Sequence, residues 1–395
     1  MAPKLALAYG EQQKWAPAAK ELERVLSSTK DANLAKQLQW QIAEYYDKAG
    51  EVSAASRAYD RYLSTILSDR SVALQTVVET RHRLAQLAKR EGNAKREMAL
   101  LRDIMESDRR GGAERTDRTR YLGAMAALTL AEPAAQAFRQ VALVEPLQKQ
   151  LKLKKARLEE ALNAYGLASE PGVAEVSTAV TYQVAAMYRD FGKAILGSQR
   201  PKKLSAIELE QYDVLLEEQA LPFEDKASET HEVNARRATQ GIYDTWVRKS
   251  MDALAEMMPV RYGKRERGEG VDLAEATDTK LAEMAKRLEL TIYESPRPAA
   301  QLNQLGVVYR RMGKFDQARN AYEQALSRDS SYAAAALNLG ILSDLYLEDW
   351  PKAMAMYEKY LSMAPQGDAQ VSKWLADLKR RKMPRQASEP KKEAP

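Results

Sequence analysis

The sequence predicts an all-α fold, a helical solenoid of stacked helix pairs with a non-repeat central segment of long helices. Three observations support this prediction. Apolar residues recur every three or four positions in each periodic stretch, and no stretch alternates with the period of two that a strand requires. Small and aromatic residues repeat about 34 positions apart near the C-terminus and 37 apart near the N-terminus. Such repetition is typical of solenoids, in which each unit packs on its neighbours.

The composition fits a folded chain whose body is almost neutral. The 395 residues are 45% hydrophobic and 29% charged, which is enough apolar material for a buried core. Lys and Arg total 61 and Asp and Glu total 55, and residues 379–395 alone carry seven of the basic and two of the acidic side chains. The balance elsewhere excludes a body-wide basic surface and predicts no nucleic-acid partner.

Several classes of chemistry are excluded by the residues that are missing. The chain has no cysteine, so disulfides, thiolate metal sites and cysteine nucleophiles are excluded. With only His82 and His231, a multi-histidine metal site is excluded as well. We find no phosphate-binding glycine loop, nucleophile elbow or His-Glu-x-x-His motif. The sequence therefore predicts a protein that is not an enzyme and binds no cofactor or metal, and no apolar run approaches the ~20 residues that span a bilayer.

The clearest repeat lies near the C-terminus. Leu305-Gly306 recurs 34 residues later as Leu339-Gly340. Three further positions recur at a spacing of 35, namely Ala318, Tyr322 and Leu326 as Ala353, Tyr357 and Leu361. We expect Gly306 to lie where the two helices of a unit approach too closely for a side chain, and Gly313 to end the first helix in the left-handed region.

This order of residue types resembles the tetratricopeptide repeat, a helix–turn–helix unit of 34 residues. The N-terminal part carries the pattern with looser spacing, and Ala18 recurs as Ala55. We expect about four units over residues 1–144, a central region over 145–271, and a C-terminal pair with leading and capping helices over 272–382. A disordered charged tail is expected over 383–395. Pro17, Pro133 and Pro351 each precede a small residue, and we expect them to open the second helix of their units.

The central region is predicted to consist of long helices. Amphipathic periodicity indicates helices over 148–168 and 173–196. Ser205 and Glu208 form a capping-box pattern that opens a third helix, and Pro222 marks a kink or a fresh start. From there an apolar stripe with a spacing of three or four residues continues over 223–258, which predicts one unbroken helix of some 35 residues. His231 lies on this stripe and is predicted to be a packed core histidine.

The resemblance implies a concave groove, lined by the first helix of each unit, that binds peptides or protein helices. At the matching positions stand, in the N-terminal array, Trp40, Glu44, His82 and Arg120, and in the C-terminal pair, Asn303, Val307, Arg310, Arg311 and Asn338. An ordinary solvated helix face is the competing interpretation for each. We expect Arg310→Glu and Arg311→Glu to weaken partner binding and leave the fold intact, because exposed charges contribute little to stability.

The segment 212–227 and its continuation through Ile242-Tyr243-Asp244-Thr245-Trp246 resemble repeat proteins of proteobacteria. Those proteins are encoded beside TonB, ExbB and ExbD-type energy-transducing genes or belong to the related gliding-motility machinery. The resemblance covers about residues 212–365. It implies a periplasmic scaffold whose partners are proteins of a cell-envelope complex. A cytoplasmic adaptor for assembly or secretion is the alternative, and a hydrolase is disfavoured because no nucleophile–base pair is recognisable.

The start of the chain suggests a longer parent. Ala6 corresponds to Ala43 of the second unit, and only five residues precede it where the repeat pattern places seven. A repeat array usually protects its first unit with a cap. We therefore expect further repeats before Met1 and, for the envelope setting, a secretion signal before them. The alternative is a short natural protein whose first helix is frayed.

Overall fold

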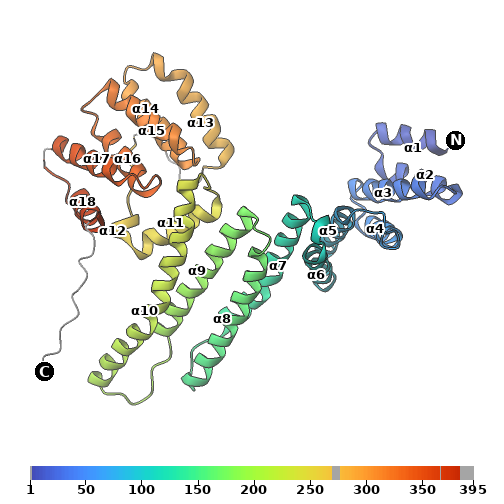
Figure 1. The fold of residues 1–395 in the computed structure, drawn as a ribbon, viewed down its shortest axis with the longest axis horizontal. Helices are drawn as coiled ribbons and strands as arrows, with labels where there is room; N and C mark the ends of the chain where they lie inside the picture. Colours follow the sequence, from blue (N-terminus) through green and yellow to red (C-terminus); the bar gives the residue numbers. More distant parts are fainter. Residues whose placement is uncertain (1, 269–275, 365, 383–395) are drawn as a thin grey trace. The chain divides into compact units, whose positions relative to one another are not determined.

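The computed structural model describes residues 2–268, 276–364 and 366–382. These residues form α-helices and short 3-10 helices and contain no strand (Figure 1). The predicted all-α repeat fold is confirmed. The tail expected over 383–395 lies outside the described residues.

The chain separates into two compact units. The first comprises Met1–Val180 with Lys193–Glu217, and the second comprises Thr181–Gly192 with Glu218–Pro395. The boundaries expected near residues 144 and 271 do not coincide with these units. Two helices contribute residues to both units, α9 (Ala174–Leu196) and α10 (Ala206–Arg237).

The first unit begins with three helix pairs in which each helix packs on the next. Their helices are α1 (Ala2–Glu11), α2 (Trp15–Ser28), α3 (Ala32–Lys48), α4 (Val52–Leu67), α5 (Leu74–Arg90) and α6 (Ala94–Arg110). The longer helices α7 (Asp117–Gln140) and α8 (Leu147–Ser169) follow and pack on each other. Buried alanines such as Ala18, Ala43 and Ala55 let the paired helices approach closely.

The second unit is built mainly from the C-terminal helices. They are α11 (Thr245–Met257), α12 (Pro259–Tyr262), α13 (Asp278–Thr291), α14 (Pro298–Arg311), α15 (Phe315–Arg328), α16 (Ala333–Leu345), α17 (Trp350–Met363) and α18 (Ala369–Lys382). Helices α14 with α15 and α16 with α17 form the two predicted repeats, and α18 packs on α17. The capping helix expected at the end of the range 272–382 is α18.

The expected helix pair of the fourth N-terminal unit is wrong. Pro133 does not open a second helix but lies inside the continuous helix α7. A proline within a helix removes one hydrogen bond and costs about 3 kcal/mol. The two residues directly before Pro133 are Ala131 and Glu132, neither of which turns the chain or caps a new helix. The buried residues Ala131, Ala135 and Phe138 hold both sides of the proline in the core.

The expected unbroken helix over 223–258 is also wrong. Helix α10 continues through Pro222 and ends at Arg237, and α11 begins at Thr245. Between them Gly241 has a φ of 80°, in the left-handed region that glycine tolerates. The Asp244 carboxylate then accepts hydrogen bonds from the amides of Trp246 and Val247, each at 2.9 Å, and caps α11. The apolar stripe does not reveal this break, because both helices bury their apolar faces.

The capping box at the start of α10 is confirmed. The Ser205 amide donates to the Glu208 carboxylate at 2.8 Å, and the Glu208 amide donates to the Ser205 hydroxyl at 3.3 Å. Helices α8 and α9 agree with the predicted ranges 148–168 and 173–196 within one residue at each end.

The small residues of the C-terminal repeats lie where the pattern predicts. A Cβ atom on Gly306 would overlap the ring of Tyr322, and one on Gly340 would lie 2.7 Å from Cε1 of Tyr357. Both tyrosines belong to the second helix of their own unit and are fully buried. Gly313 ends α14 with a φ of 76°, as expected.

We expect Gly306→Leu to lower the free energy of unfolding by about 1–3 kcal/mol or more, because the added side chain overpacks the contact with Tyr322. Denaturant unfolding followed by circular dichroism measures this. The matched control is Gly166→Ala in α8, where an added Cβ meets no atom within 4 Å. That substitution should leave stability unchanged or raise it by about 0.5–1 kcal/mol. Equal effects at the two glycines would contradict the close approach.

The prediction that His231 is a packed core residue is confirmed. Its side chain is buried, and Nδ1 lies 3.2 Å from the Ser250 hydroxyl. The ring of Tyr182 packs against it with a centroid distance of 5.6 Å. Burial, assisted by the positive charge of Arg189, lowers the pKa of His231 to about 4.

This pKa predicts a stability loss in mild acid. The folded state keeps His231 neutral down to about pH 4, whereas the unfolded chain takes up a proton below its ordinary pKa of 6.5. Stability is therefore fully present above pH 6.5 and falls as the pH drops through 6.5 toward 4, by roughly 2 kcal/mol at pH 5. Urea unfolding at pH 7 and pH 5 should show this loss in the wild type and a smaller one in His231→Gln. Equal losses would contradict the assignment.

Candidate functional site

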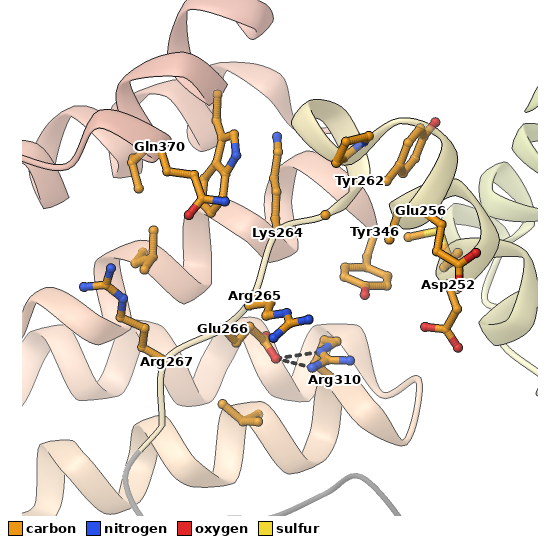
Figure 2. Close-up of a pocket in the computed structure, with 18 of the residues that line it drawn as sticks. Asp252, Glu256, Tyr262, Lys264, Arg265, Glu266, Arg267, Arg310, Tyr346 and Gln370 are labelled. Atoms are coloured by element: carbon orange, nitrogen blue, oxygen red, sulfur yellow. Dashed lines mark hydrogen bonds and ion pairs between the residues drawn. The ribbon is translucent and has the colours of Figure 1, made fainter.

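Four of the residues predicted for the C-terminal groove come together in the structure. Asn303, Val307 and Arg310 lie on α14 and Asn338 on α16. They do not face open solvent. The stretch that follows α12 runs past Arg310 in an extended path (Figure 2), and it contacts Asn303, Arg310 and Asn338. We call residues 264–267 of this stretch the groove segment. Its sequence is Lys-Arg-Glu-Arg.

Two asparagines hold the backbone of the groove segment. The Arg267 amide donates to Oδ1 of Asn338 at 2.7 Å, and Nδ2 of Asn338 donates to the Arg267 carbonyl at 2.6 Å. Nδ2 of Asn303 donates to the same carbonyl at 2.9 Å. Both asparagine side chains are completely buried, and Asn338 also donates to Oδ1 of Asn303 at 2.9 Å. An amide side chain offers one acceptor and two donors, so it can bind an extended peptide much as a neighbouring strand does.

Glu266 is bound from two helices. Nε of Arg310 donates to its Oε2 atom at 2.7 Å, and the Tyr322 hydroxyl donates to its Oε1 atom at 2.7 Å. Only 4% of the Glu266 side chain and 15% of the Arg310 side chain are exposed. Burial, together with the charge of Glu266, raises the pKa of Tyr322 well above its ordinary value, which keeps this hydroxyl a donor.

The expectation that Arg310 is an exposed residue is therefore wrong. The repeat pattern correctly places it on the inner helix but does not reveal that the chain's own Glu266 covers it. Arg311, the next residue, is partly exposed and makes no hydrogen bond or ion pair with the groove segment in the described part of the chain.

Lys264 enters the core of the second unit. Its ammonium group forms an ion pair with Asp344 of α16, and neither side chain is exposed. Asp344 also accepts a hydrogen bond from the Tyr357 hydroxyl at 3.3 Å and forms an ion pair with Arg381 at 3.3 Å. The rings of Tyr357 and Trp374 lie 5.5 and 5.6 Å from the Lys264 ammonium. Burial lowers the pKa of Lys264, and the charge of Asp344 opposes that effect.

Arg267, the last residue of the groove segment, binds side chains of the groove at that end. Its guanidinium donates to the Tyr360 hydroxyl at 2.5 Å and to the Asp368 carboxylate at 2.8 Å. The side chain remains 58% exposed, so this pair is the most solvent-accessible of the three charge contacts.

A cavity of about 940 Å³ lies beside the groove segment, between it and α11. Asp252 and Glu256 of α11 line one wall, and Arg265 points to the same side (Figure 2). Tyr346, Val371 and Trp374 line the rest with the segment itself. The groove is thus filled by four residues, while the space next to it has acidic side chains on its wall.

The N-terminal groove residues do not gather in one site. Trp40 packs on Tyr59 and Tyr62, with both ring centroids at 5.3 Å, and lines a cavity of about 450 Å³ between α3 and α5. Glu44, His82 and Arg120 do not line that cavity. Among them, His82 lies 3.0 Å from Gln86, and Arg120 pairs with Asp117 at 3.4 Å.

The repeat pattern alone does not reveal the ligand side of the C-terminal groove, residues 264–267. Two signals could have identified them. Asp344 is the one charged residue of the mostly apolar helix α16, which indicates a buried cationic partner. Asn303 and Asn338 both lie on the first helices of successive repeats, 35 residues apart, one position off the 34-residue spacing of Gly306 and Gly340.

Comparisons with known proteins support the repeat fold. Residues 298–366, which span α14–α17, match the tetratricopeptide repeat family. None of the curated proteins matches the chain. The match confirms the C-terminal repeat pair. Tetratricopeptide repeats bind other proteins and are typical of non-enzymatic scaffolds of protein–protein interaction. No helix that the structure describes is both long and apolar enough to cross a membrane.

Two solved structures show only a loose overall likeness. One is a circular tandem repeat protein with novel repeat topology and enhanced subunit contact surfaces, 15% identical over 96% of this chain and 94% of that chain, with a TM-score of 0.27. The other is a monomeric mutant of IFIT1 with Gppp-AAAA, 13% identical over 80% of this chain and 63% of that chain, with a TM-score of 0.25. At these TM-scores neither structure supports a conclusion about function.

Proposed function

We propose that this chain is a non-enzymatic scaffold that holds partner proteins through extended segments bound in its repeat grooves. One observation carries the proposal. The C-terminal groove binds a peptide in extended form, and Asn303 and Asn338 bind its backbone rather than a particular side chain. A site that binds backbone atoms can hold an extended segment of another chain, and the side-chain contacts beside it then select which segment fits.

The setting that we propose is a bacterial cell-envelope complex, with the chain in the periplasm. Support comes from the resemblance of residues 212–365 to repeat proteins encoded beside energy-transducing or gliding-motility genes. A cytoplasmic adaptor for assembly or secretion remains the second candidate. Fractionation of cells that produce the protein from its own gene separates the two. Recovery with periplasmic markers supports the envelope setting, and recovery with cytoplasmic markers selects the adaptor.

The scaffold proposal is tested by capture with matched groove variants. Affinity-tagged full-length protein is used to capture partners from cell extract, and each captured protein is then purified and titrated against the wild type. We expect Asn338→Ala or Trp40→Ala to weaken the binding of a genuine partner, because each removes a side chain that lines a groove. Gly166→Ala, which lies on an open helix position, serves as the control. A partner whose affinity is unchanged in both groove variants would contradict binding through the grooves.

A further inference from the structure

The strongest unexplained feature is that the C-terminal groove already holds a peptide, and that the peptide belongs to the same chain. Asp344, Arg310 and Asp368 present alternating negative, positive and negative charges along the groove. The groove segment offers the matching order, with Lys264, Glu266 and Arg267 as its positive, negative and positive members. A peptide with a different charge order would leave buried charges unpaired, which is strongly unfavourable. The groove is therefore selective for charge order as well as for extended backbone.

The groove segment belongs to no helix or sheet. In the described part of the chain, the only backbone hydrogen bonds of residues 264–267 are those that join Arg267 to the two asparagines. All its remaining hydrogen bonds and ion pairs are made by side chains. Its departure would break no secondary-structure element, and it would open the groove to water, so that Asp344 and Arg310 would be hydrated instead of left unpaired in a dry core.

From these observations we infer that the C-terminal groove binds an extended peptide of the form Lys-x-Glu-Arg that belongs to a partner protein, and that residues 264–267 compete with this peptide for the groove. This inference rests on the proposed scaffold function and specifies the ligand chemistry of one of its grooves. Partner binding there requires the groove segment to leave.

Residues 264–267 belong to the same chain as the groove, which gives them an advantage over an added peptide. The size of this advantage can be estimated. A segment on a short linker acts at an effective concentration on the order of millimolar. Competition from a segment of the same chain would therefore weaken the apparent binding of an added peptide by about tenfold or more. Removal of the competitor should therefore reveal the affinity of the groove.

The test measures fluorescence anisotropy of a labelled synthetic peptide, Tyr-Gly-Lys-Arg-Glu-Arg-Gly, which corresponds to residues 262–268. It is titrated with the full-length wild type and with a variant in which residues 264–267 are replaced by Gly-Ser-Gly-Ser. We expect the replacement variant to bind the peptide about tenfold or more tightly than the wild type does. The addition of Asn338→Ala should abolish that gain, and a peptide with Lys in place of Glu should not bind.

A second variant keeps the test decisive if the replacement variant does not fold. Arg267→Glu reverses the most exposed of the three charge contacts, so it should weaken the competitor without leaving a charge unpaired in the core. We expect it to bind the added peptide several-fold more tightly than the wild type. Arg265→Glu makes the same charge change at a residue that pairs with no groove side chain, and it should bind as the wild type does.

The inference is overturned if the folded replacement variant and Arg267→Glu bind the peptide no more tightly than the wild type. It is also overturned if the gain survives Asn338→Ala, because binding would then occur elsewhere. In either case the groove segment is a permanent structural part. The scaffold function is judged separately, since capture that depends on Trp40 does not involve the C-terminal groove.

Discussion

Replacement of Asp344 by alanine is expected to lower the free energy of unfolding by about 3–5 kcal/mol, as for other buried ion pairs that lose one partner. Lys264 and Asp344 are both fully removed from solvent. The substitution would leave the Lys264 ammonium buried without its carboxylate, and Arg381 and the Tyr357 hydroxyl would each lose an acceptor. Equilibrium unfolding in urea, followed by circular dichroism and by tryptophan fluorescence, measures the loss.

The control for this prediction is Asp316→Ala. Asp316 is a highly exposed residue that pairs with Arg319, one helical turn away. Exposed pairs of this kind contribute about 0.3–0.5 kcal/mol, so the change should be small. A double variant, Lys264→Met with Asp344→Leu, removes both charges and should recover much of the lost stability. If Asp344→Ala and Asp316→Ala proved equally mild, the buried pair would not exist as described.

The second large effect is expected at Arg310. Arg310→Glu would place a carboxylate beside Glu266 in a site where both side chains are almost fully buried. The favourable pair becomes a like-charge pair, and we expect a loss of about 3–5 kcal/mol or more in the free energy of unfolding. The same denaturant titration measures it, and the groove segment should become accessible to proteolysis at Lys264 and Arg265.

Arg311→Glu is the matched control, because it makes the same charge change one residue later. Arg311 is partly exposed and forms no hydrogen bond or ion pair with residues 264–267, as far as the chain is described. Surface substitutions of this kind usually change stability by no more than about 0.5 kcal/mol. A result in which both variants are tolerated would support the original expectation that this face is solvated. A large loss for Arg310→Glu alone would show that Glu266 covers it.

Much of the helical architecture could be predicted from local features. The start of α10 follows from Ser205 and Glu208, whose side chains cap the backbone three residues apart. The end of α14 follows from Gly313, whose conformation other residues rarely adopt. Where prediction failed, at Pro133 and Gly241, the outcome depended on a balance between a local breaker and the packing of the flanking residues. Packing prevailed around Pro133, and the glycine and Asp244 prevailed at the end of α10.

The groove shows a different division. By itself the sequence determined the all-α repeat fold and the spacing of the two C-terminal units, because these features follow from periodicity within the repeats. The same spacing placed four groove residues on the first helices of these units, namely Asn303, Val307, Arg310 and Asn338. Only the tertiary structure decided that the groove is filled by residues 264–267. Lys264 meets Asp344 across 80 positions of sequence, and Arg267 meets Asn338 across 71. Such a contact leaves no local period, since the segment has no secondary structure of its own, and it is set by the match between its charges and those of the folded groove.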